Sequence, residues 1–175
     1  MTSPLRIFPL SHHDILQRLP ELSDILVDSV NGGASVSFML PFHPDKAVAF
    51  WQKIAHSVAA NERIVLAAEL GDGTLVGTVQ LITDLPENQP HRAEVAKLLV
   101  HSRGRRQGIA RRLMSALEQE AVAQAKSVLV LDTATGSGAD DFYQQCGWQK
   151  AGEIPRYALM PDGEMTATSV YYKFV

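Results

Sequence analysis

Five arginines lie within ten residues of a chain whose formal net charge is −3, and no acidic residue interrupts them. They are Arg103, Arg105, Arg106, Arg111 and Arg112. Gly108 stands among them, directly before an amphipathic stretch that predicts a helix. A helix N-terminus offers unpaired N–H groups and about half a positive charge, and glycine lets an anion come close. The spacing predicts a phosphate- or pyrophosphate-binding loop over residues 105–110.

The same residues would also fit a solvated basic loop at the start of a helix. Their neighbours favour the binding loop, because the apolar run Leu98-Leu99-Val100 comes directly before them and predicts a strand. An isoelectric point near 6 and one short basic cluster do not favour nucleic acid, which requires a broad basic face.

Two acidic residues stand where strands are expected to begin or end. Glu94 opens the apolar stretch 93–101, and Asp132 follows the run 128–131. Ligands of α/β sheets gather at the carboxyl ends of strands, and a carboxylate can take a proton from an amine. Glu94 could instead pair with Arg92, and Asp132 could cap the turn that follows it. Both are candidate general bases.

Composition bounds the class of protein. A chain of 175 residues with 46% apolar content predicts one domain, over residues 1–175. No 18-residue apolar run and no secretory leader pattern occur, so we expect a soluble cytoplasmic protein without a membrane partner. The lone Cys146 and six scattered histidines lack metal-ligand spacing, so we expect no metal.

The elements that must position these residues follow from periodicity and turn signals. The sequence predicts strands over residues 6–10, 64–70, 74–83, 93–101, 128–131, 148–157 and 169–174. It predicts helices that begin near Ser11, Pro44, Ala110 and Gly138, with Pro20 bending or dividing the first. This order differs from a doubly wound nucleotide-binding fold, which alternates strand and helix throughout. It predicts an α/β (α+β) fold with a mixed, mostly antiparallel sheet of about seven strands and about four helices.

Two motifs carry a family resemblance. Arg105-Arg106-Gln107-Gly108-Ile109-Ala110 resembles the acyl-CoA signature of the GNAT superfamily of N-acetyltransferases, although many members have glycine where this chain has Arg106. The segment 139–148, which contains Phe142-Tyr143 and Gly147-Trp148, resembles the second signature of that family. The element order is also that of the GNAT fold. The resemblance implies acetyl-CoA as cosubstrate and transfer of its acetyl group to an amine by direct attack.

The resemblance also implies roles for individual residues. Residues 105–110, namely Arg105, Arg106, Gln107, Gly108, Ile109 and Ala110, would bind the cosubstrate, and the backbone of Leu99 and Val100 would meet its thioester and pantetheine arm where the central strand bulges. Tyr143 would lie near the thioester sulfur and give the thiolate a proton or a hydrogen bond. It could instead be an aromatic residue that hydrogen-bonds locally.

A narrower resemblance runs through three further segments. Residues 32–39, 92–95 and 152–155 are similar to the tabtoxin-resistance acetyltransferases, which acetylate an amino-acid-like toxin. This implies a small acceptor that carries a carboxylate, with Glu94 and Asp132 beside it. The expected acceptor-binding residues are Ser35, Phe38, Arg92 and Tyr157. Two alternatives stay open, a peptide or protein N-acetyltransferase and a non-catalytic acyl-CoA sensor, and the oligomeric state is not predicted.

Overall fold

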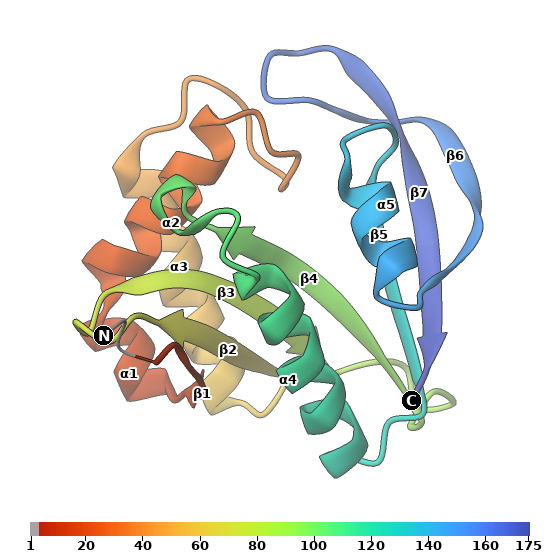
Figure 1. Cartoon of the computed structure of the whole chain (residues 1–175), viewed down its shortest axis with the longest axis horizontal. Coiled ribbons are helices and arrows are strands. Elements are labelled where there is room, and N and C mark those ends of the chain that lie inside the picture. Colours follow the sequence, from red (N-terminus) through yellow and green to blue (C-terminus); the bar gives the residue numbers. More distant parts are fainter. Residues whose placement is uncertain (1–3) are drawn as a thin grey trace.

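Seven strands form one sheet in the structure, a computed structural model that describes residues 4–175 (Figure 1). The strands are β1 (Arg6–Leu10), β2 (Arg63–Glu69), β3 (Leu75–Ile82), β4 (Arg92–Val100), β5 (Val128–Ala134), β6 (Gln149–Leu159) and β7 (Met165–Phe174). Their order across the sheet is β1-β2-β3-β4-β5-β7-β6. All neighbours are antiparallel except β4 and β5. The mixed, mostly antiparallel sheet is as predicted.

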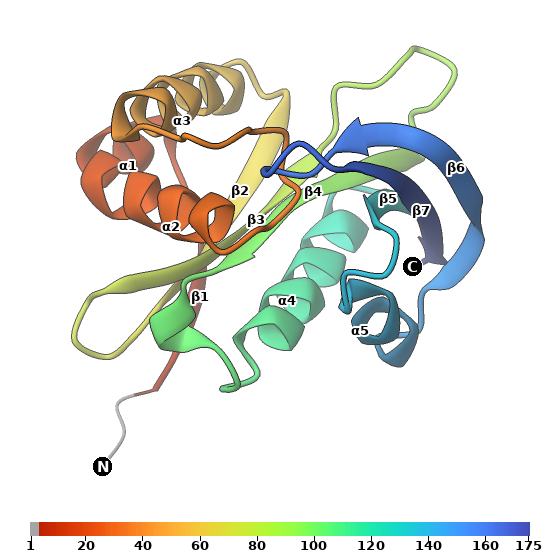
Figure 2. The same cartoon turned by 90° about the horizontal axis from the view of Figure 1, so that it is seen from above.

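Helices cover both faces of this sheet (Figure 2). One face carries α1 (His12–Gln17), α2 (Leu19–Asn31) and α3 (Pro44–Ala59), and the other carries α4 (Ile109–Ala123) and α5 (Ala139–Gln145). Two apolar cores result. The first includes Leu22, Trp51 and Val65, and the second includes Leu113, Leu117 and Leu129, all fully buried. Burial of each such side chain is worth about 1.5–3 kcal/mol.

The first predicted helix is two helices, divided just before Pro20. Ser11 and Asp14 form a capping box at the start of α1, as their spacing predicts. The short helix ends at Arg18, and Pro20 stands in the first turn of α2, where its missing N–H costs nothing. Asp28, near the C-terminal end of α2, accepts hydrogen bonds from Ser102, which lies just after the end of β4.

The sheet opens between β4 and β5. The two parallel strands pair only through Arg92–Glu94 of β4 and Val128–Val130 of β5, although both strands continue beyond these residues. In Figure 1 they diverge from this point. The divergence leaves part of the inner edges of β4 and β5 unpaired with each other. A wedge-shaped gap in the sheet is therefore built into its middle.

A β-bulge distorts β4 beside this gap. Gln80 of β3 pairs with Ala96 and Thr78 pairs with Leu99, so β4 has one residue more than its partner over this interval. Lys97 lies in the bulge with φ of +54°. The bulge turns the residues after it relative to those before it. The bulge lies two residues before Leu99. The family resemblance implies that the backbone of Leu99 and Val100 meets the cosubstrate.

The predicted end of β5 at Leu131 is wrong. The strand continues to Ala134, because β7 pairs with it over the whole range from Val128 to Ala134. Its burial also alternates, with Leu129 and Leu131 buried and Val128 only half-buried, so the run is not buried on both faces. Asp132 therefore lies within a strand and not after its end. Long-range pairing with β7, which the local pattern does not contain, extends the strand.

Candidate functional site

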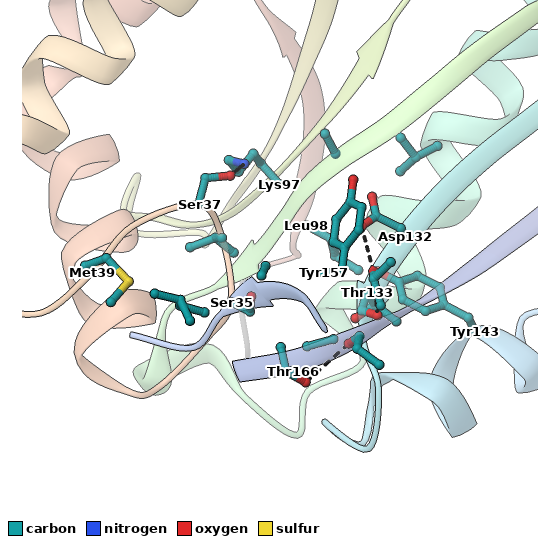
Figure 3. A pocket seen from close by; sticks show the side chains of 18 residues that line it. Ser35, Ser37, Met39, Lys97, Leu98, Asp132, Thr133, Tyr143, Tyr157 and Thr166 are labelled. Atoms are coloured by element: carbon teal, nitrogen blue, oxygen red, sulfur yellow. Dashed lines mark hydrogen bonds between the residues drawn. The ribbon is translucent and has the colours of Figure 1, made fainter. Parts of the chain in front are cut away.

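A cavity of about 470 Å³ occupies the gap between β4 and β5 (Figure 3). Residues 95–98 of β4 and 132–134 of β5 form its walls, together with Tyr143 of α5. The loop after α2 contributes residues 35–37 and 39, and the β6–β7 hairpin contributes residues 157–159 and 166–168. Segments from five parts of the chain thus meet at the opening of the sheet. We call this cavity the wedge pocket.

Asp132 lies in the wedge pocket with its carboxylate held by a neighbouring strand. The Thr168 hydroxyl of β7 donates a hydrogen bond of 2.7 Å to Asp132 Oδ2. Thr168 is buried, whereas Asp132 is exposed to the pocket, so one oxygen of the carboxylate is fixed and the group faces the solvent in the cavity. A carboxylate in this position can accept a proton from a bound amine.

Tyr143 reaches the same pocket from α5. Its ring is buried against Trp148 and Tyr171, at centroid distances of 6.1 and 5.9 Å. Burial raises the pKa of the Tyr143 phenol to about 12, and the nearby Cys146 and Asp132 act in the same direction. The phenol is therefore protonated at neutral pH and can donate a hydrogen bond or a proton into the pocket.

Tyr157 lines the pocket because β6 bulges at Pro155. Ile154 pairs with Thr168 and Ala158 with Thr166, so three residues of β6 stand opposite one residue of β7. Proline removes one ladder hydrogen bond and is tolerated at such an irregular edge. The Tyr157 ring is half exposed and points into the cavity (Figure 3).

The loop after α2 closes one end of the wedge pocket. Its Leu40 N–H donates a hydrogen bond of 3.0 Å to the carbonyl oxygen of Pro161, which lies in the turn between β6 and β7. Figure 2 shows the two segments meeting above the divergence of β4 and β5. Ser35 lines the cavity just before this contact. The loop and the hairpin together form a cover over the pocket.

Three of the residues predicted as bases or as acceptor-binding residues lie outside the lining of the wedge pocket. Glu94 forms a salt bridge of 3.2 Å with Arg92, and Arg92 Nε also donates to Gln89 Oε1 at 2.8 Å. Phe38 packs against Phe42 at a centroid distance of 4.7 Å, within the core under α1–α3. Of the predicted acceptor-binding residues, the pocket thus brings together Ser35 and Tyr157 with the candidate base Asp132 and with Tyr143.

Lys97 is a pocket residue that sequence reasoning missed. Its ammonium group donates a hydrogen bond of 3.0 Å to Ser37 Oγ. Burial lowers the pKa of the Lys97 ammonium, while the Asp132 carboxylate acts in the opposite direction. The bulge that brings Lys97 here depends on pairing with β3. A lysine in the middle of an apolar strand was the one local signal available.

A second cavity, of about 290 Å³, lies at the N-terminus of α4. Gly108 is the N-cap residue there with φ of +71°, and a Cβ at this position would have no heavy atom within 4 Å. Arg105, Arg106 and Arg111 line this cavity together with Val100, Ile109 and Ala110. Open space, cationic side chains and free helix N–H groups are what a pyrophosphate requires.

The arginine cluster has two kinds of members. Arg103 donates to the Leu75 carbonyl oxygen at 2.7 Å and pairs with Asp24, and Arg112 donates to the Leu5 carbonyl oxygen at 3.1 Å. These two arginines tie the loop and helix to the rest of the chain. The other three line the second cavity. Gln107 donates from its side chain to the Arg103 carbonyl oxygen at 3.3 Å.

Asp28 of α2 anchors the start of the same loop. The backbone N–H and hydroxyl of Ser102 both donate to the Asp28 carboxylate at 2.8 Å. Burial disfavours the charge of Asp28, but the Ser102 hydrogen bonds and the nearby His101 and Arg105 outweigh it and lower the pKa of this carboxyl.

Among residues 4–175 no helix has the length and apolarity to span a bilayer, and no group of three or more His, Cys, Asp or Glu could hold a metal.

Residues 32–148 match the family model described as the acetyltransferase (GNAT) family. This chain belongs to the GNAT family. A curated relative, an uncharacterized N-acetyltransferase in the hisH-hisA intergenic region of Azospirillum brasilense, is 32% identical over 116 residues, which cover 65% of this chain and 67% of the relative. The family-model match over residues 32–148 spans both the loop after α2 and the two GNAT motifs.

Solved structures share the fold at low identity. An acetyltransferase from Acinetobacter baylyi ADP1 has a TM-score of 0.82 at 18% identity, covering 100% of this chain and 95% of its own. The Salmonella typhimurium acetyltransferase yncA, solved with its cofactor acetyl-CoA, has a TM-score of 0.78 at 17% identity, covering 98% and 94%. The GNAT fold predicted from the sequence is confirmed. The protein is a GNAT-type N-acetyltransferase, of a family that uses acetyl-CoA.

Proposed function

We propose that this GNAT enzyme acetylates the amine of a small molecule, an amino acid or an amino-acid-like toxin. The cover over the wedge pocket carries this proposal. The Leu40–Pro161 hydrogen bond joins the loop after α2 to the β6–β7 turn, so that one end of the acceptor site is closed. A peptide acceptor would require an open groove there. A cavity of about 470 Å³ suits an amino acid.

Asp132 is the proposed general base. An amine with a pKa near 9–10 is mostly protonated at neutral pH and must lose a proton before it attacks. The Asp132 carboxylate, held by Thr168, is the acidic group in the lining of the wedge pocket and can receive that proton directly or through water. Glu94 is the second candidate. It precedes the lining residue Val95 on β4 and forms a salt bridge with Arg92.

Transfer then occurs without a covalent enzyme intermediate. Acetyl-CoA supplies the thioester, bound through the cavity at α4 by Arg105, Arg106, Arg111 and residues 107–110. The amine nitrogen forms a bond to the acetyl carbon as the carbon–sulfur bond breaks. Backbone N–H groups of Leu99 or Val100 polarise the carbonyl oxygen, and Tyr143 gives its proton or a hydrogen bond to the departing thiolate. Cys146 is a poor alternative nucleophile, since burial raises the pKa of its thiol.

Release of free CoA thiol, measured with acetyl-CoA and a panel of small amines, amino acids and short peptides, tests this function. We expect the highest kcat/KM with an amino acid or an amino-acid-like compound. A clear preference for peptides would show that the enzyme is a peptide N-acetyltransferase and would contradict the proposal. Acetyl-CoA binding by calorimetry with no thiol release across the panel would favour an acyl-CoA sensor. If the preferred acceptor is a toxin, expression of the enzyme should also protect sensitive cells against it.

A further inference from the structure

The charged residues of the wedge pocket form one complementary pair. Of the 18 residues that line it, all within the described range 4–175, Lys97 alone is basic and Asp132 alone is acidic. They come from different walls. Lys97 lies on β4 beside Ser37, and Asp132 lies on β5 beside Thr133 and Tyr143 (Figure 3). The pocket thus has a cationic side and an anionic side.

The Lys97 ammonium group has unused hydrogen-bonding capacity. An ammonium has three N–H donors, and its contact with Ser37 Oγ at 3.0 Å uses one of them. Within residues 4–175 it forms no salt bridge, whereas Lys150 pairs with Glu153 at 2.6 Å and Lys173 pairs with Glu118 at 2.7 Å. A cation that is partly removed from water with no anion in direct contact is unfavourable. An anionic ligand would offset that cost.

The backbone at this point supports a role in binding. Lys97 and Ser37 both have positive φ, +54° and +80°, although neither is a glycine. Strained residues of this kind persist where the surrounding structure fixes them, and they cluster at ligand sites. Here the β4 bulge fixes the backbone of Lys97, and the loop after α2 fixes that of Ser37. The pair that they form faces the cavity.

We infer that Lys97, positioned by Ser37, binds the anionic group of the acceptor, its carboxylate or a similar oxyacid. The inference rests on the proposed function, because it assigns one end of the acceptor proposed there. The acceptor's carboxylate then lies against β4 and its amine lies toward Asp132 and Tyr143. Arg92, the residue that the sequence suggests for the carboxylate, is engaged by Glu94 and Gln89 outside the pocket lining. Lys97 is thus a specificity-determining residue.

The test compares three acceptors that share one side chain: an α-amino acid from the panel, its primary amide and the amine that lacks the carboxyl group. We expect wild-type enzyme to prefer the acid. Lys97→Met should raise KM for the acid about 10- to 100-fold, the loss of one charge-assisted hydrogen bond, with little change for the amide or the amine. The kcat with saturating acid should change far less than KM. Lys97→Arg should restore part of the preference.

Lys53→Met is the matched control, since Lys53 is an exposed lysine of α3 outside the lining. It should leave all three KM values unchanged. Acetyl-CoA affinity, measured by calorimetry, shows whether Lys97→Met is folded. If wild-type enzyme acetylates the acid and the amide equally well, or Lys97→Met weakens all three acceptors alike, the inference is wrong while the proposed function stands. If no acceptor in the panel is acetylated, both are wrong.

Discussion

Six non-glycine residues in the described part of the chain have positive φ, and four of them border the two cavities. Asn61 and Ala125 follow helices, where such a residue commonly ends the helix. The others are Ser37, Lys97, Arg106 and Arg156. Ser37 and Lys97 line the wedge pocket, Arg156 stands beside Tyr157, and Arg106 lines the cavity at α4. Each costs about 1–2 kcal/mol relative to a right-handed backbone.

At the residue scale, Tyr143→Phe should separate chemistry from binding. The change removes one oxygen and keeps the ring that packs against Trp148 and Tyr171. Because the proposed role of the phenol is to act as the thiolate departs, kcat should fall roughly 10- to 1,000-fold with little change in acetyl-CoA affinity. The rate of thiol release measures kcat, and calorimetry measures the affinity for acetyl-CoA. Tyr172→Phe, on the neighbouring strand β7, is the control, and wild-type turnover in Tyr143→Phe would exclude the residue from the reaction.

The two candidate bases are distinguished by the pH profile of kcat/KM. If a carboxylate is the base, log(kcat/KM) should rise with pH and then level off. Asp132→Asn should flatten or displace this rise, because the amide cannot take the proton. Glu94→Gln should raise KM and leave the profile in place if Glu94 only orients the acceptor's amine. Full activity in both variants would show that neither carboxylate is the base.

At the element scale, α2 and the loop before α4 depend on each other through Asp28. The carboxylate accepts two hydrogen bonds from Ser102, 74 residues away in the sequence. The loop that contains Arg105 and Gly108 follows directly. The contact explains how a short, arginine-rich segment, whose like charges repel each other, keeps a defined conformation at the helix N-terminus.

Asp28→Asn should reduce stability in a pH-dependent way. The folded-state pKa of Asp28 lies below its usual value of 3.8, so its contribution to the free energy of unfolding is complete above that value. The contribution is lost as the pH falls through the folded-state value. Urea unfolding should therefore show wild type more stable by roughly 1–2 kcal/mol at pH 7, with a smaller difference near pH 3. Asp84→Asn, at an exposed position, should show no such convergence.

At the scale of the whole molecule, the sequence predicted what is local and missed what depends on distant pairing. The Ser11–Asp14 cap and the division of the first helix at Pro20 are decided by residues close together in the sequence. The extension of β5 is decided by β7, and the bulge that places Lys97 is decided by pairing with β3. The motifs therefore point to the proposed cosubstrate side of the site, whereas Lys97 on the proposed acceptor side emerges only from the assembled sheet.

Binding of acetyl-CoA should stabilise the whole fold, because the proposed site joins β4, α4 and α5. At a ligand concentration 100 times Kd the expected gain is about 2.7 kcal/mol, or roughly 5–10 °C in Tm for a chain of this size. Gly108→Asp should abolish most of this gain, since a carboxylate at the helix N-terminus repels the pyrophosphate and weakens binding by more than about 2 kcal/mol.

Gly73→Asp is the control for the last comparison. Gly73 has φ of +86° and open space around a Cβ, as Gly108 does, but it lies in the β2–β3 turn outside both cavities. Both variants introduce the same charge at a left-handed position, so both should lower the Tm of the free protein. Only Gly108→Asp should lose the increase with acetyl-CoA, measured by differential scanning calorimetry. An equal increase in the two variants would show that the N-terminus of α4 does not bind the pyrophosphate.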